Sequence, residues 1–142
     1  MNSPKNIILL KFFNVAIILL ILYFSIINTN IIPIEEENLP NDKILHLGAY
    51  LILSMSTVLA RWEIIDSKKG NNLSKNKEIF QKYSIVIIIC LIYGIIIEII
   101  QFIVPSRNFD LLDIITNGIG IFAGILIHFV AQKLLERNKI AF

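Results

Sequence analysis

The chain has 142 residues, a net charge of +2, a hydrophobic content of 56% and a mean hydropathy of +0.73. Soluble domains are about 45–50% apolar, so we expect this chain in a lipid bilayer rather than in water. Its single cysteine, Cys90, excludes a disulfide framework and a cysteine-based metal site. No nucleophile elbow, phosphate-binding loop or cofactor motif is present. We therefore expect no cofactor and no nucleic-acid partner.

Four apolar segments are long enough to cross a bilayer as helices, because roughly 20 helical residues cover its hydrocarbon core. In chain order they are Phe12–Asn28, Ile44–Ile65, Tyr83–Val104 and Leu111–Leu135. The first resembles a signal peptide but lacks a small-residue cleavage site, which predicts a retained signal-anchor helix. The predicted fold class is therefore all-α, a polytopic membrane protein with four transmembrane helices.

The basic residues predict the orientation of these helices. Eleven of the 13 Lys and Arg residues flank the spans on the side of the two termini, and only Lys43 and Arg107 lie on the other side. The positive-inside rule then places both termini in the cytoplasm, an N-in/C-in topology. The polar segment Asp66–Gln81 becomes an inner loop, whereas Thr29–Asp42 and Pro105–Asp110 face outward.

Polar side chains in the last three spans fall at two depths below the outer surface. A deeper layer lies six residues, or about 9 Å, from the outer helix ends and contains Tyr50, Glu98 and Asn117. A shallower layer, about 3–5 Å deep, contains His46, Gln101 and Asp113. Spacings of three or four residues place them on one face of each helix, in the stripes Asp42–His46–Tyr50, Gly94–Glu98–Gln101 and Asp113–Asn117–Gly120–Gly124.

A polar pocket open to the outer surface would need one such stripe on each helix. A central Asp costs roughly 2.5–3.5 kcal/mol in a membrane helix, so buried acids indicate a site rather than a stabilising feature. The spacing Gly120-x-x-x-Gly124 also allows another helix to approach closely. The residues predicted to bind a ligand are Asp42, Lys43, His46, Tyr50, Glu98, Gln101, Arg107, Asp113 and Asn117.

Most of these residues also have a purely structural interpretation. Asp42, Asp110 and Asp113 suit helix N-termini as caps, and Lys43 and Arg107 could anchor at the interface. Tyr50 could serve packing alone, and Asn117 could join helices through hydrogen bonds. Glu98 is the hardest to explain structurally, since at its depth it needs a partner or a proton. His128 is interpreted as an interfacial residue outside any site.

Two segments resemble the VanZ-like family of bacterial integral membrane proteins: DKILHLGAYLIL (Asp42–Leu53) and YGIIIEIIQFIVPSRNFDLLDIITNGIGIFAG (Tyr93–Gly124). The family's pattern falls on Asp42, Lys43, His46, Tyr50, Glu98, Gln101, Pro105, Arg107, Asp113, Asn117, Gly120 and Gly124. The resemblance implies a single domain over 1–142, with its motifs at 42–124, in the bacterial plasma membrane. The family's namesake is associated with low-level resistance to the glycopeptide antibiotic teicoplanin.

Three classes of function fit these residues. A binding protein would hold an amphiphilic cell-envelope molecule: a membrane lipid, a lipid-linked wall precursor or a lipoglycopeptide, with Arg107 suited to phosphate or carboxylate. A membrane-embedded enzyme would use His46, Glu98 and Asp113 as candidate acid–base residues. An ion or proton pathway has the least support, because the inner half of the bundle offers few polar steps. One histidine among carboxylates is a weak zinc signal, so no metal is predicted.

Overall fold

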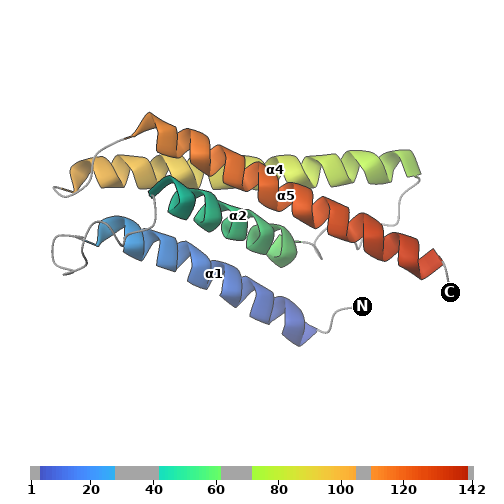
Figure 1. Cartoon of the computed structure of the whole chain (residues 1–142). Coiled ribbons are helices and arrows are strands. Elements are labelled where there is room, and N and C mark those ends of the chain that lie inside the picture. Colours follow the sequence, from blue (N-terminus) through green and yellow to red (C-terminus); the bar gives the residue numbers. More distant parts are fainter. Residues whose placement is uncertain (1–3, 28–41, 62–71, 105–109, 141–142) are drawn as a thin grey trace.

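The computed structural model describes residues 4–27, 42–61, 72–104 and 110–140. Its elements are the four helices α1 (Pro4–Ile26), α2 (Asp42–Arg61), α4 (Asn72–Ile103) and α5 (Leu111–Ile140). Successive helices run in opposite directions, and the two termini lie at the same end of the bundle (Figure 1). The four helices are long and apolar enough to span a membrane, so the all-α, four-span prediction is confirmed.

The helices extend beyond the predicted spans on the side of the termini. The first begins at Pro4 rather than Phe12, and the last continues to Ile140. The predicted inner loop Asp66–Gln81 is wrong in its second half, because α4 begins at Asn72. Hydropathy detects only the part of a helix that needs lipid, whereas a helix that is already nucleated continues into water wherever its residues allow it.

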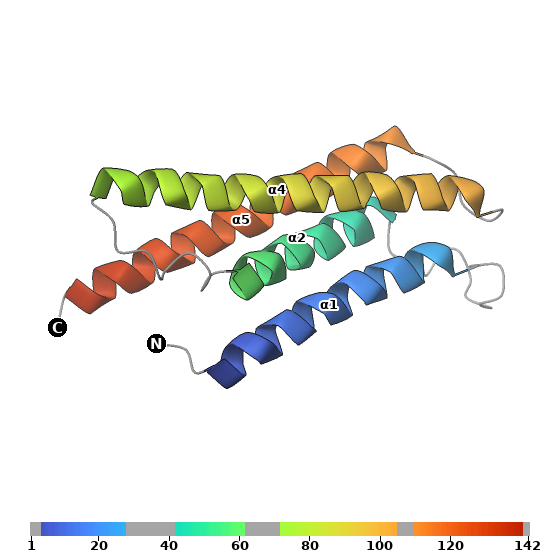
Figure 2. The ribbon, with the colours of Figure 1, turned by 180° about the vertical axis from the view of Figure 1, so that it is seen from behind.

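Helix α2 occupies the centre of the bundle and packs most extensively against α5. It lies between α1 and the crossing pair α4 and α5 when the bundle is seen from either side (Figures 1 and 2). Nearly half of the α2 span is buried, against 6% of the α1 span. The small core includes Tyr50, Leu53, Val86 and Ile121, while large apolar side chains on every helix face outward, as a lipid environment requires.

Two glycines allow the close approach of α2 and α5. A Cβ atom on Gly120 would lie 2.5 Å from the carbonyl oxygen of Leu47, and one on Gly124 would lie 2.5 Å from that of Leu51. Any side chain at either position would therefore push the two backbones apart. The predicted role of this glycine pair is confirmed, and α2 is its partner helix. The contact holds the polar stripes of the two helices face to face.

Candidate functional site

Lys43 joins the beginnings of α2 and α5. Its Nζ donates hydrogen bonds to Asp110 Oδ2 (2.7 Å) and Asp113 Oδ1 (3.2 Å). The Asp113 side chain is buried, whereas those of Lys43 and Asp110 are 39% and 40% exposed. Lys43 therefore forms ion pairs with two aspartates, a role beyond the membrane-interface anchor that the sequence also allowed. It forms the exposed rim of the predicted site.

Asp110 has a second role, as the N-terminal cap of α5. Its Oδ1 accepts a hydrogen bond from the backbone N–H of Leu112 at 2.8 Å, which satisfies a donor that the helix leaves free. The capping interpretation of Asp110 is confirmed. Hydrogen bonds from Lys43 and then from the Leu112 N–H hold the pKa of Asp110 below its usual range.

His46 lies one turn further along α2 and is surrounded by polar groups from α4 and α5. Its Nδ1 lies 3.0 Å from Asn117 Oδ1. Because an amide oxygen can only accept, this assignment of the Asn117 amide requires Nδ1 to carry the hydrogen. The same Nδ1 lies 3.8 Å from Glu98 Oε1, and Nε2 lies 3.8 Å from Asp42 Oδ2. The imidazole thus has a carboxylate near each ring nitrogen.

Glu98 is fully buried on α4 and faces this imidazole. Neither of its carboxylate oxygens has a hydrogen-bond partner among the residues that the structure describes, and the same holds for Tyr50 Oη and Asn117 Nδ2. A buried polar atom left unpaired costs about 1–3 kcal/mol. Because four such atoms surround one histidine, this group of residues is expected to lower the stability of the fold, which indicates a role other than stabilisation.

Gly94 makes room for two of these side chains. A Cβ atom at this position would lie 3.2 Å from Tyr50 Cε1 and 3.5 Å from Asn117 Nδ2. The glycine in the α4 stripe therefore lets α2 and α5 place polar groups against the backbone of α4. The rings of Tyr50 and Tyr93 lie beside each other, with centroids 6.5 Å apart.

The structure brings most of the predicted site residues together and joins the two predicted layers. His46, assigned to the shallow layer, bonds Asn117 of the deep layer and approaches Glu98. We call the set Asp42, Lys43, His46, Tyr50, Glu98, Asp110, Asp113 and Asn117 the polar cluster. Gln101 is buried nearby but has no side-chain hydrogen bond to this cluster. Pro105 and Arg107 lie outside the described residues.

One trio in the cluster has the composition of a cation site. One ligand atom from each of Asp42, His46 and Asp113 lies within 4.8 Å of the others. This trio contains Asp42 where the acid–base trio predicted from the sequence, His46, Glu98 and Asp113, contains Glu98. The Lys43 ammonium already bonds Asp113 at 3.2 Å, and this positive charge opposes a metal ion at the same carboxylate.

His128, which the sequence interprets as an interfacial residue outside any site, is buried on α5 against α4. Its Nδ1 lies 3.1 Å from Tyr83 Oη. Its depth along α5 does not predict this burial, because burial depends on the face of the helix on which the residue lies. It packs near the end of the bundle opposite the polar cluster.

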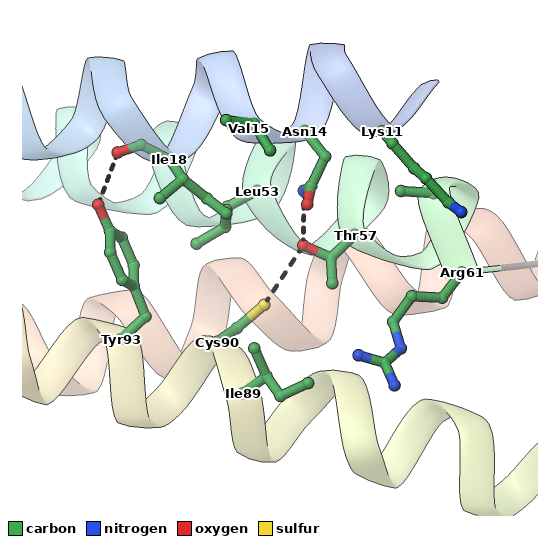
Figure 3. A pocket seen from close by; sticks show the side chains of 11 residues that line it. Lys11, Asn14, Val15, Ile18, Leu53, Thr57, Arg61, Ile89, Cys90 and Tyr93 are labelled. Carbon is green, nitrogen blue, oxygen red and sulfur yellow. Dashed lines mark hydrogen bonds between the residues drawn. The ribbon is translucent and has the colours of Figure 1, made fainter. Parts of the chain in front are cut away.

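Sequence reasoning missed a second polar group, which joins α1 to α2. Asn14 Nδ2 donates hydrogen bonds to Ser56 Oγ and Thr57 Oγ1, both at 2.9 Å. An asparagine in the middle of an apolar span was the available signal. A cavity of about 440 Å³ lies beside Asn14 and Thr57, between α1, α2 and α4 (Figure 3). It is distinct from the polar cluster.

Comparison with known proteins agrees with this architecture. The model of the VanZ/LLP1 family matches residues 4–132, which is most of the chain and includes all four helices. Neither a curated protein nor a solved structure matches the chain. The match includes every described residue of the polar cluster as well as the glycine pair of α5. The chain belongs to the VanZ/LLP1 family.

Proposed function

We propose that this multi-pass membrane protein binds the headgroup of an amphiphilic cell-envelope molecule at the polar cluster. The observation that carries the proposal is the group of buried, unpaired polar atoms on Tyr50, Glu98 and Asn117. Each costs about 1–3 kcal/mol while it lacks a partner. A headgroup that supplies hydrogen bonds to them would recover that cost on binding, and its tails would remain in the surrounding lipid.

The charge of the cluster narrows the chemistry of the headgroup. Its described residues carry four carboxylate groups, on Asp42, Glu98, Asp110 and Asp113, against the single ammonium of Lys43 and the imidazole of His46. This excess of acid favours a ligand with an ammonium group or several hydrogen-bond donors. Arg107 retains its predicted role as a partner for phosphate or carboxylate.

The proposal places the polar cluster at the outer face of the bacterial plasma membrane, with both termini in the cytoplasm. Its support is the asymmetric distribution of Lys and Arg along the sequence. Single cysteines at Glu36 and Lys69, in a Cys90→Ser background, test it through an impermeant thiol reagent on intact cells. Labelling at Glu36 alone is expected. Labelling at Lys69 alone would mean that the topology is the opposite one, with both termini outside the cell.

Reduced susceptibility to teicoplanin is the phenotype that we propose for this site. The protein would be expressed in a sensitive Gram-positive host, and the minimal inhibitory concentration of teicoplanin would be measured. The wild type is expected to raise it, and His46→Ala to abolish the increase. His128→Ala is the matched control, because it removes a buried histidine far from the cluster and should retain the increase. An unchanged concentration with the wild type would refute the resistance phenotype.

Acid–base catalysis on a lipid-linked or cell-wall substrate is the alternative function. Its support is His46, which lies 3.8 Å from a carboxylate oxygen at each ring nitrogen, as a proton-transfer residue would. Glu98→Gln separates the two functions, since an amide still forms hydrogen bonds but cannot exchange a proton. A binder should lose less than tenfold in function, the scale of one neutral hydrogen bond. An enzyme should lose about 10²–10⁴-fold in rate.

A further inference from the structure

The cavity of about 440 Å³ between α1, α2 and α4 has the size of small-molecule sites, which are typically about 300–1,000 Å³. We call it the α1 cleft. It lies toward the end of the bundle where α1 begins and α2 ends, away from the polar cluster (Figure 3). Any ligand that it holds is therefore additional to the one proposed above.

Two cations from different helices line the same end of the α1 cleft. Lys11 comes from α1 and Arg61 from the last turn of α2, and both lie on the same side of the cleft, with the Arg61 guanidinium nearer to Ile89 (Figure 3). Neither forms an ion pair with any residue in the described part of the chain. Two uncompensated positive charges at one end of the cleft favour an anion, and the guanidinium fork of Arg61 suits phosphate oxygens.

The rest of the cleft is mainly apolar, so it suits the hydrocarbon part of a ligand. Val15, Ile18 and Ile89 line it between the cationic end and Tyr93. The donors of two polar side chains nearby already have partners within the protein. Asn14 bonds two hydroxyl groups of α2, and Tyr93 Oη donates to the carbonyl oxygen of Ile18 at 2.6 Å. No polar ligand group is required beyond the cationic end.

The α1 cleft is open to the surroundings of the bundle. Val15 is 50% exposed and Ile89 is 39% exposed, although both line the cleft. The Tyr93–Ile18 hydrogen bond ties α1 to α4 at one end, so the two helices are connected there and separated nearer Lys11. In a bilayer this opening faces the acyl chains, which allows a lipid to enter sideways.

We propose that the α1 cleft binds one anionic bilayer phospholipid. Its phosphate would lie between Lys11 and Arg61, and one acyl chain would lie along Val15, Ile18 and Ile89. Basic pockets between transmembrane helices are known to bind anionic lipid headgroups. The combination of two cations with an adjoining apolar wall selects such a lipid over a zwitterionic one with the same chains.

Native mass spectrometry of the purified full chain in detergent tests this proposal with two lipids of identical acyl chains, phosphatidylglycerol and phosphatidylcholine. The wild type is expected to retain one phosphatidylglycerol in preference to phosphatidylcholine. Lys11→Gln with Arg61→Gln should weaken this binding by about 25-fold, at roughly fivefold for each basic residue. Lys77→Gln with Lys133→Gln is the control, because it removes the same charge from exposed positions outside the cleft.

A third variant tests the apolar wall with both cations in place. Val15→Trp should fill the α1 cleft and reduce phosphatidylglycerol binding, and its half-exposed position makes the substitution tolerable for folding. Equal retention of the two lipids by the wild type would overturn the proposal. So would a double Lys11/Arg61 variant that binds as tightly as the control, or a Val15→Trp variant that binds as tightly as the wild type.

Discussion

The interface between α2 and α5 and the interface between α1 and its neighbours are built in opposite ways. Gly120 and Gly124 bring the backbones of α2 and α5 into direct contact. Helix α1 instead meets its neighbours through the side chains of Asn14 and Tyr93, which leaves a cavity beside them. Lipid offers little hydrophobic drive for helices to associate, so van der Waals packing and hydrogen bonds determine which helices fit tightly.

The two interfaces also use their polar residues differently. Beside α1, the amide of Asn14 donates two hydrogen bonds, and the hydroxyl of Tyr93 reaches a backbone oxygen. Around His46, the carboxylate of Glu98 and the hydroxyl of Tyr50 are buried without such partners in the described structure. Satisfied polar groups hold helices together, whereas unsatisfied ones indicate a place where a ligand or a proton completes the structure.

The largest effect is expected from breaking the tight interface. Gly120→Ala would place a methyl group against the backbone of Leu47, and overpacking of this kind costs about 1–3 kcal/mol. Gly118→Ala is the matched control, since a Cβ there meets nothing within 4 Å. Thermal unfolding in detergent should show a clear loss of stability for the first variant alone. Because alanine has the higher helix propensity at both positions, an equal change of stability in the two variants would mean that close packing against Leu47 does not set the role of Gly120.

The sequence predicted the fold class and the polar faces because both depend on short-range rules. An apolar run of sufficient length requires a helix in lipid, and spacings of three and four residues identify one face. Contact partners depend on how the helices cross, which no single helix specifies. His46 lies near Asp113, which belongs to the same predicted layer. It also bonds Asn117, although residue counts along the helices assign Asn117 to the deeper layer.

Two side-chain contacts could not be predicted from the sequence, because depth along a helix does not give the direction in which a side chain points. In the structure, Asn14 faces α2 and His128 faces Tyr83 of α4. A polar residue on an otherwise apolar helix turns toward the nearest partner, since lipid provides none.

An intermediate effect is expected from loosening α1. Asn14→Leu removes two hydrogen bonds between helices, each worth about 0.6 kcal/mol in membrane proteins. Stability should fall by about 1 kcal/mol, and the buried Cys90, which also lines the cleft, should react faster with a thiol reagent. Ser25→Ala is the control, because Ser25 bonds only the backbone of its own helix. Unchanged reactivity of Cys90 would show that Asn14 does not hold α1 in place.

The smallest effect is expected at the exposed rim of the tight interface. Hydrogen bonds from Lys43 and from the Leu112 N–H lower the pKa of Asp110 in the folded state. An Asp in the unfolded chain titrates near about 3.9. The ionised carboxylate therefore stabilises the fold above about pH 4, and this contribution disappears as the pH falls through the lower, folded pKa. Solvent screening keeps it small, since both partners are well exposed.

Asp110→Asn isolates this charge, because asparagine is an equally good helix cap and preserves the start of α5. Other carboxylates also titrate in this range, so the informative quantity is the difference between the two proteins. Thermal unfolding measured from pH 7 down to pH 3 should show the wild type more stable at neutral pH, with the two curves converging at the acid end. Parallel curves would mean that the Lys43–Asp110 pair contributes nothing through its charge, and that Asp110 serves α5 only as a cap.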